Sequence, residues 1–154
     1  MSPITTLVTV GSLLAGAMAS PLLNTTRASG HLDAFVETCN RWVVTQDGPD
    51  AWLEAYCKDK GGDQWHSVLN LNHCIVNSDG YMAPGPGGDF AASCHDMELL
   101  ADSRLLAACD GRDGPKVSIF LNGFVNNDDG ELICFGYRGC AKDSTGCDDK
   151  PPQK

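Results

Sequence analysis

The clearest pattern in this chain is an alternation of apolar and polar positions with a period of two. It recurs in four short stretches, at residues 53–57, 65–71, 105–109 and 116–121. Such a period is typical of half-buried strands. No stretch has the apolar spacing of a long helix, so the chain is predicted to be all-β. The residues predicted to share a buried face are Leu53, Ala55 and Cys57; Trp65, Ser67, Leu69 and Leu71; Leu105, Ala107 and Cys109; and Val117, Ile119 and Leu121.

Turn signals separate these strands. Asp79-Gly80 and Asp129-Gly130 lie between apolar runs, and Asp-Gly favours tight hairpins because both residues tolerate positive φ. Residues 83–88 are rich in Pro and Gly, which oppose both helix and sheet, so they are interpreted as a linker.

The whole pattern occurs twice, in residues 34–82 and 89–134. Each copy has Phe, two Cys, Leu-Asn and Asn-x-Asp-Gly in the same order. A repeat of this kind predicts two similar supersecondary units and two similar surfaces. The landmarks of the first copy are Phe35, Cys39, Cys57, Leu71, Asn72, Asn77, Asp79 and Gly80. Those of the second copy are Phe90, Cys94, Cys109, Leu121, Asn122, Asn127, Asp129 and Gly130.

The ends of the chain differ from this doubled region. Residues 1–19 form an uncharged apolar run from Ile4 that closes on Ala17-Met18-Ala19, which predicts a secretory signal peptide cleaved after Ala19. A membrane anchor is the alternative, but the run is shorter than the roughly 20 residues needed to span a bilayer. Residues 20–32 form a polar segment, in which Asn24 begins an N-glycosylation sequence. Residues 135–154 form a charged, Cys-containing tail that is expected to pack little.

Charge narrows the choice of partners. The chain of 154 residues has a formal net charge of −9, and residues 1–19 contribute none of it. An acidic protein repels phosphate backbones and anionic membrane surfaces, so neither nucleic acid nor a membrane is an expected partner.

The eight cysteines, all beyond the signal peptide, fit an oxidising, extracellular location. Equivalent positions in the two repeats should bond equivalently, which predicts Cys39–Cys57 and Cys94–Cys109. Of the remaining four, we pair Cys74 with Cys134 between the repeats and Cys140 with Cys147 in the tail. Cys134–Cys140 is an alternative because that pair is also close in sequence.

The sequence offers little for catalysis or for a metal. Asp128-Asp129 and Asp148-Asp149 are adjacent carboxylates, which do not face each other across a cleft as a glycosidase pair would. Ser93-Cys94-His95 is not a nucleophile elbow. Zinc at His73-Cys74 is disfavoured because the chain has no Cys-x-x-Cys pair. We therefore expect a non-catalytic protein with no cofactor and no metal.

The doubled landmarks resemble the cyanovirin-N homology family over about residues 33–134. The resemblance implies an all-β, disulfide-stabilised lectin of two pseudo-symmetric halves. Each repeat would supply a three-stranded sheet and a β-hairpin, with hairpins exchanged between repeats. Secreted members with added cysteines are familiar from filamentous fungi. The family binds mannose-containing oligosaccharides or glycoproteins at one or two sites, one in each half.

The resemblance also implies two groups of sugar-binding residues. The two groups differ in the residues around their shared landmarks, so the sites are expected to be unequal, with a single working site as the alternative. Of the two we favour the second half, with Asn77, Asp79 and Arg112. The first half would use Glu37, Thr38, Lys58, Lys60, Asn127 and Asp129. The second half would use Asn77, Asp79, Asp89, Ser93, Asp110 and Arg112.

Two alternatives stay open at this stage. The chain is expected to be a monomer, but halves could be exchanged between two chains to give a domain-swapped dimer. The function could also be that of a secreted, disulfide-rich scaffold, for example a fungal effector, that contacts a protein partner and no longer binds sugar.

Overall fold

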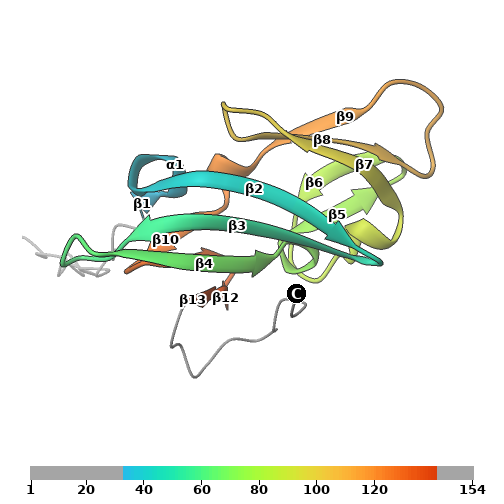
Figure 1. The fold of residues 1–154 in the computed structure, drawn as a ribbon. Coiled ribbons are helices and arrows are strands. Elements are labelled where there is room, and N and C mark those ends of the chain that lie inside the picture. Colours follow the sequence, from blue (N-terminus) through green and yellow to red (C-terminus); the bar gives the residue numbers. More distant parts are fainter. Residues whose placement is uncertain (1–32, 142–154) are drawn as a thin grey trace, which may run out of the picture.

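The computed structural model describes residues 33–141, and these residues fold mainly as antiparallel strands (Figure 1). The all-β prediction is confirmed. The predicted signal peptide, the polar segment before residue 33, Asn24 and Cys147 lie outside the described residues. Within residues 33–141, no helix is long and apolar enough to cross a membrane.

The first repeat forms a three-stranded meander followed by a hairpin. Its meander consists of β2 (Cys39–Asp47), β3 (Asp50–Lys58) and β4 (Gln64–Asn70). Its hairpin consists of β5 (Ile75–Ser78) and β6 (Tyr81–Pro84). A 3-10 turn connects the two parts at Leu71–His73.

The second repeat has the same layout. Its meander consists of β7 (Cys94–Leu99), β8 (Arg104–Cys109) and β9 (Val117–Phe120). Its hairpin consists of β10 (Asn126–Asp128) and β11 (Glu131–Cys134). Short elements complete the two copies: β1 (Asp33–Ala34), α1 (Phe35–Thr38), and 3-10 turns at Phe90–Ala92 and Leu121–Gly123.

The hairpins are exchanged between the repeats. The β10–β11 hairpin packs against β3 and β4 of the first repeat, and β6 packs against β9 of the second (Figure 1). The Ser67 hydroxyl on β4 accepts a hydrogen bond from the Leu132 amide on β11, 2.9 Å away. Each half of the molecule therefore contains a meander from one repeat and a hairpin from the other. We call the half with β2–β4 the first half and the half with β7–β9 the second half.

The alternating pattern explains which strand faces are buried. The predicted faces of β3 and β8 are almost completely excluded from solvent, as are Val117 and Ile119 on β9, whereas Phe120 on the other face of β9 is exposed. A single hydrophobic core runs through both halves, and Phe35 and Phe90, at matching places in the repeats, are fully buried in it. Burial of such large aromatic side chains contributes much of a domain's stabilisation.

The two repeats also share an irregularity of the backbone, a β-bulge in the first strand pair of each meander. The pairing of β2 with β3 shifts between Asn40 and Val43, and the pairing of β7 with β8 shifts between His95 and Glu98. Each bulge contains a non-glycine residue with positive φ, Arg41 at 53° and Asp96 at 54°. Bulges bend a strand locally, so the two meanders curve at equivalent positions.

Three of the predicted disulfides are confirmed. Cys39–Cys57 joins β2 to β3, and Cys94–Cys109 joins β7 to β8. Cys74–Cys134 joins the two repeats next to the exchanged hairpins. Cys140 is disulfide-bonded, but the partner predicted for it, Cys147, lies outside the described residues.

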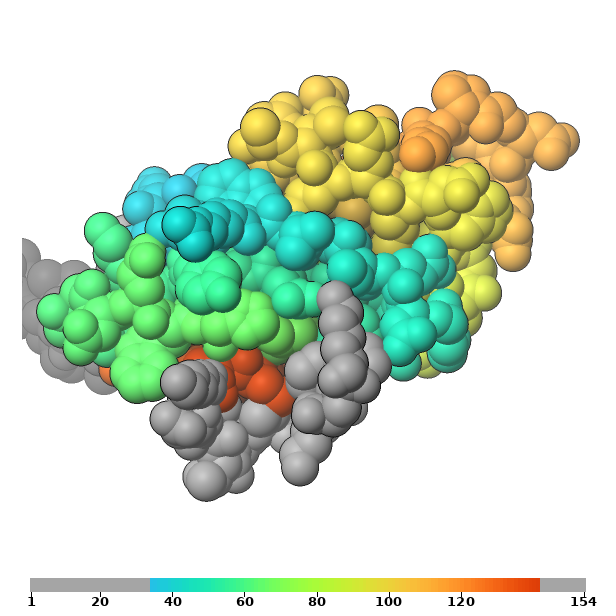
Figure 2. All heavy atoms as spheres, in the orientation of Figure 1, coloured from blue at the N-terminus to red at the C-terminus, as the bar shows by residue number. Residues whose placement is uncertain are grey.

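Two predictions from composition are wrong. The beginning of the tail is not loosely packed, because β12 (Tyr137–Arg138) pairs with β11 and β13 (Cys140–Ala141) pairs with β4. Figure 2 shows the red atoms of this segment below the green atoms of the first repeat. The linker is also shorter than predicted. Ala83 and Pro84 belong to β6, where Pro84 ends a two-stranded sheet and needs no further ladder bond.

Candidate functional site

The first half is organised around the side chain of Asn127 on β10, which is only 6% exposed. Its Nδ2 donates to Thr38 Oγ1 and to the Lys58 carbonyl, both at 2.8 Å, and its Oδ1 accepts from the Gly130 amide at 2.9 Å. One side chain thus holds the hairpin turn, the end of α1 and the end of β3 together. Because both amide hydrogens are already used, Asn127 acts here as a support for its neighbours.

The second half repeats this network atom for atom. Asn77 Nδ2 donates to Ser93 Oγ at 2.9 Å and to the Asp110 carbonyl at 3.1 Å. Asn77 Oδ1 accepts from the Gly80 amide at 2.9 Å. The two Asn-x-Asp-Gly turns are therefore fixed in the same way, each against the other repeat's meander.

A hollow of about 190 Å³, lined by polar and charged residues, lies beside the Asn127 network. Its walls come from the end of α1, the end of β3 with the following loop, and the β10–β11 turn. Across it, the Lys60 amide donates to Asp129 Oδ1 at 2.8 Å, and Lys60 Nζ lies 3.6 Å from Asp129 Oδ2. The residues that line the hollow are Thr38, Lys58, Asp59, Lys60, Asn127, Asp128 and Asp129.

Asp59 is held by Trp65 next to this hollow. Trp65 Nε1 donates to Asp59 Oδ2 at 2.8 Å, and the Asp63 amide donates to Asp59 Oδ1 at 2.9 Å. The Trp65 hydrogen bond, opposed by some desolvation and assisted by backbone N–H groups, holds the pKa of Asp59 below its ordinary value of 3.8. The carboxylate is therefore ionised at neutral pH and fixed in orientation.

Arg138 on β12 approaches the same turn from its other side. Its guanidinium donates to Asp128 Oδ2 and, at 2.9 Å, to Glu131 Oε2. These two bonds raise the pKa of Arg138 above its ordinary value, and the bond to Asp128 has the larger effect. Asp128 lines the hollow, so Arg138 contacts one of the hollow's walls without lining the hollow itself.

The second half has a larger and differently placed hollow of about 450 Å³. It lies along the end of β8 and the loop towards β9. Near it, the Arg112 guanidinium lies 4.7 Å from the centre of the Tyr81 ring, a cation–π contact that connects this loop to the β5–β6 turn. The residues that line it are His95, Ala108, Cys109, Asp110, Gly111, Arg112, Asp113 and Gly114.

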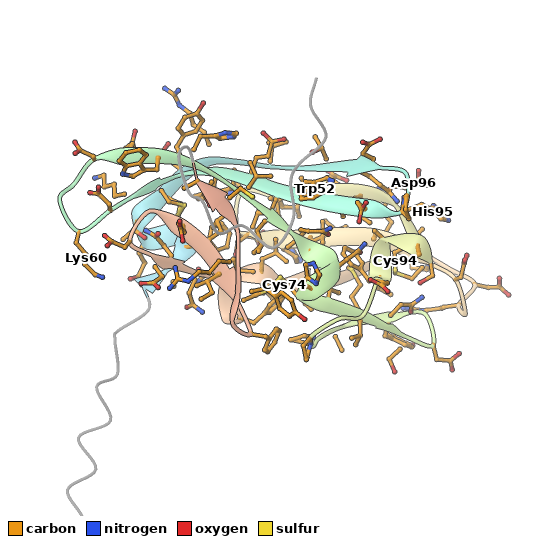
Figure 3. All side chains as sticks on the ribbon, turned by 90° about the horizontal axis from the view of Figure 1, so that it is seen from below. Trp52, Lys60, Cys74, Cys94, His95 and Asp96 are labelled. Atoms are coloured by element: carbon orange, nitrogen blue, oxygen red, sulfur yellow. A yellow bond between two sulfur atoms is a disulfide. The ribbon has the colours of Figure 1, made fainter. Side chains whose placement is uncertain are left out.

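The two hollows lie far apart. Figure 3 places Lys60, which lines the first, at one end of the molecule and His95, which lines the second, at the opposite end. Cys74 lies between them in this view.

The predicted residues are gathered better in the first half than in the second. Of the six first-half residues, only Glu37 does not line the hollow. Of the six second-half residues, Asp110 and Arg112 line the hollow there, while Asn77 and Ser93 bond to each other and Asp79 lies against the Gly111 backbone. Asp89 instead precedes the 3-10 turn at Phe90, with its backbone bridged to Val76. The geometry thus gives no support to our preference for the second half.

Several residues at these sites escaped the sequence interpretation. Asp59 and Asp128 line the first hollow, and His95 and Asp113 line the second. Asp128 is considered from the sequence only as one of two adjacent carboxylates, although its position as the second residue of the repeated Asn-x-Asp-Gly landmark is a usable signal. Trp65 and Arg138 act through long-range contacts that no local pattern reveals. Among residues 33–141, no group of three or more His, Cys, Asp or Glu side chains is placed to hold a metal ion.

Comparison with known proteins identifies the family of the chain. The family model described as the CVNH domain matches residues 35–133. None of the curated proteins matches the chain significantly.

Solved structures show the same fold. The CVNH protein of T. borchii is 27% identical with a TM-score of 0.56, over 66% of this chain and 98% of that one. Microvirin in complex with mannobiose is 28% identical with a TM-score of 0.52, over 67% and 99%. A variant of MoCVNH3 in complex with (N-GlcNAc)4 is 21% identical with a TM-score of 0.55, over 68% and 99%, a likeness that shows the fold alone.

Proposed function

The chain belongs to the CVNH domain family, and from this premise we propose that it is a secreted, non-catalytic lectin that binds mannose-containing oligosaccharides. The observation that carries the proposal is the first-half hollow. It unites residues from both repeats at the position where the resemblance to cyanovirin-N homologues placed a sugar site. Carbohydrate binding follows from the family, whereas mannose and secretion are the finer parts of the proposal.

The comparison with microvirin supports mannose as the ligand. Microvirin was solved with mannobiose, and it covers 67% of this chain at 28% identity. Mannose presents neighbouring hydroxyl groups, each of which can donate and accept a hydrogen bond. The hollow offers acceptors on Asp128 and Asp129, an ammonium donor on Lys58, and the Thr38 hydroxyl.

Fixed side chains favour binding here. Asp129 is held by Lys60, Asp59 by Trp65, and Thr38 receives a hydrogen bond from Asn127. Groups already held in place lose little conformational entropy when a sugar binds, so more of the interaction energy appears as affinity. The first half is therefore the stronger site in this proposal.

The second half is proposed as a weaker site. Asp110 stands where the first half has Lys58, and Gly111 stands where the first half has Asp59, so the charge and shape around the shared network differ. With sites at opposite ends, the protein could still cross-link multivalent glycans with an avidity above that of either site.

Secretion is supported by the apolar residues 4–19 and by the disulfides within residues 33–141, which persist in oxidising compartments. Absence of catalysis is proposed because lectins of this kind bind sugars without reaction. The carboxylates of the first hollow are also bonded to protein partners, which leaves no obvious acid and base pair.

The proposal is tested on a glycan array with the oxidised chain, followed by mannobiose titration of two matched variants. Asp129→Asn and Asp79→Asn change the same turn position, where both residues have positive φ. We expect Asp129→Asn to weaken binding about tenfold, the loss of roughly one charge-assisted hydrogen bond, and Asp79→Asn to have a smaller effect.

Absence of binding to every glycan on the array, including all those that contain mannose, would refute the lectin proposal and favour the protein-binding alternative. Strong binding only to other sugars, such as N-acetylglucosamine oligomers, would support the lectin function and refute the proposed specificity for mannose. A larger loss in Asp79→Asn than in Asp129→Asn would move the stronger site to the second half.

A further inference from the structure

Arg138 belongs to a part of the chain that lies beyond the matched family domain, which ends at residue 133. It is nevertheless folded against that domain. Residues 137–138 form β12, in which Arg138 pairs with Ile133 and Tyr137 with Cys134 of β11. This short strand extends the sheet that carries the first-half turn, and it sets the Arg138 side chain beside the base of that turn.

The Arg138 guanidinium joins two carboxylates that face each other across the hairpin. Asp128 and Glu131 are paired residues at the ends of β10 and β11, directly before and after the turn. Arg138 Nη2 donates to Asp128 and Nη1 donates to Glu131. The carboxylate side chains are only 25% and 23% exposed, and that of Arg138 is 44% exposed, so water screens these contacts only in part.

Without a cation, this pair of positions would be unfavourable, because like charges directly opposite in an antiparallel pair repel each other. The second half has no such problem. Its corresponding pair is Ser78 and Tyr81, neither of which is negatively charged. The contact of Arg138 is therefore specific to the first half and is not part of the repeated design.

Asp128 connects Arg138 to the hollow. One of its oxygens receives the Arg138 hydrogen bond, while the residue itself lines the hollow together with Asp129. We propose that Arg138 is a positioning residue for the first-half sugar site, which fixes Asp128 and the turn in the binding conformation. This inference rests on the proposed lectin function. It makes the start of the tail a contributor to affinity in one half only.

The test is a titration of 15N-labelled full-length oxidised chain with mannobiose, read at the Gly130 amide for the first half and at the Gly80 amide for the second. Arg138→Gln removes the charge, and Arg138→Lys keeps the charge but cannot bridge both carboxylates. Arg104→Gln is the matched control, because Arg104 also pairs with an exposed carboxylate, Asp102, but lines neither hollow.

We expect Arg138→Gln to weaken binding about threefold to tenfold at Gly130 and to leave Gly80 unchanged, in keeping with the size of partly exposed ion-pair networks. Arg138→Lys should restore part of the affinity, and Arg104→Gln should have no effect. In an Asp128→Asn background, Arg138→Gln should cause little further loss, because the two residues act as a unit.

The outcomes separate this inference from the function on which it rests. Binding by the unsubstituted chain together with an unchanged affinity in Arg138→Gln would overturn the role of Arg138 alone. Failure of the unsubstituted chain to bind any mannose-containing glycan would overturn both. Equal weakening of binding at Gly130 and Gly80 in Arg138→Gln would show a general structural effect and would also reject the inference. The same holds if the free energy of binding that Arg138→Gln loses equals the free energy of unfolding that it loses.

Discussion

Asn77 and Asn127 connect each turn of the exchanged hairpins to the opposite repeat. Each amide makes three hydrogen bonds, to equivalent partners in the two halves. A side chain with this many partners is costly to remove, because its removal leaves the amides of the buried Gly80 or Gly130 without an acceptor. The two asparagines therefore matter first for the shape of the sites and only through that shape for binding.

Asn127→Ala should lower the free energy of unfolding by about 2–3 kcal/mol, since it leaves the Gly130 amide and the Lys58 carbonyl without their partner. Asn77→Ala should cost less, because Asn77 is more exposed. Urea unfolding of both variants measures the difference. Equal losses, or a loss below the experimental error for Asn127→Ala, would contradict the role given to this side chain.

Asp59 predicts a pH dependence. Its pKa is lower in the folded protein than the ordinary 3.8, mainly because of Trp65. Between the two values the unfolded chain binds the proton more readily. The stabilisation by the ionised carboxylate is thus fully present above about pH 4 and is lost as the pH falls through the lowered folded pKa.

Asp59→Asn should remove this contribution. The difference in unfolding free energy between the original chain and Asp59→Asn should shrink as the pH falls from about 5 to about 2. Urea unfolding across this range measures it, with the Trp65 indole proton as a local NMR probe. A difference that is constant with pH would contradict the assignment.

The hairpin turns pack closely against the loops that follow β3 and β8. Gly80 has a φ of 82°, and a Cβ at this position would lie 2.3 Å from Arg112 Cβ and 2.8 Å from the Arg112 amide nitrogen. A Cβ on Gly130 would lie 2.8 Å from Cδ1 of the Trp65 side chain on β4. Both turns thus require glycine for space as well as for backbone conformation.

Gly80→Ala should therefore destabilise the protein by more than the roughly 1 kcal/mol expected from positive φ alone. Gly48→Ala is the matched control, because Gly48 also has positive φ and no atom lies within 4 Å of its added Cβ. Thermal or urea unfolding of the two variants gives the comparison. Similar costs for both would show that the close approach is unimportant.

The pattern of the sequence predicted the long elements well and the short ones poorly. Alternation over four or more residues marks one buried face, so the faces of β3, β8 and β9 could be predicted. Strands of two residues, such as β12 and β13, have no period to detect, and their pairing depends on where β11 and β4 present free edges. Composition alone was therefore misleading for the start of the tail.

The exchange of hairpins makes the whole molecule one cooperative unit. The core runs through both halves, and Cys74–Cys134 joins the repeats across 60 residues of sequence. A cross-link over a long loop restricts the unfolded chain more than a cross-link over a short one. This disulfide should therefore contribute more to stability than the local disulfide within either meander.

Replacing both Cys74 and Cys134 with Ala should cost about 4 kcal/mol in the chain-entropy model, against about 3 kcal/mol for the same change at Cys94 and Cys109, which are 15 residues apart. Urea unfolding of the oxidised variants measures both losses. If the Cys94–Cys109 variant lost more, the interpretation of Cys74–Cys134 as the principal connection between repeats would be wrong.

At the scale of the whole molecule, the doubled sequence predicted two similar surfaces, and the residues around the shared landmarks predicted that the two sites are unequal. It located two equivalent networks, because Asn77 and Asn127 belong to the repeated landmarks. The sequence favoured the second half, a preference that the geometry of the two hollows does not support. The difference arises from equivalent repeat positions that hold different residues, such as Lys58 against Asp110, and from Arg138, which lies beyond the second repeat and bonds to carboxylates on either side of the β10–β11 turn.

The most direct test of the central claim is a site-resolved NMR titration of the oxidised chain with mannobiose. We expect the amide shifts to concentrate on the residues around the first hollow, with Lys60, Asp129 and Gly130 among the largest, and smaller shifts to occur near Arg112. Absence of shifts at millimolar sugar, or shifts confined to surfaces away from both hollows, would contradict it.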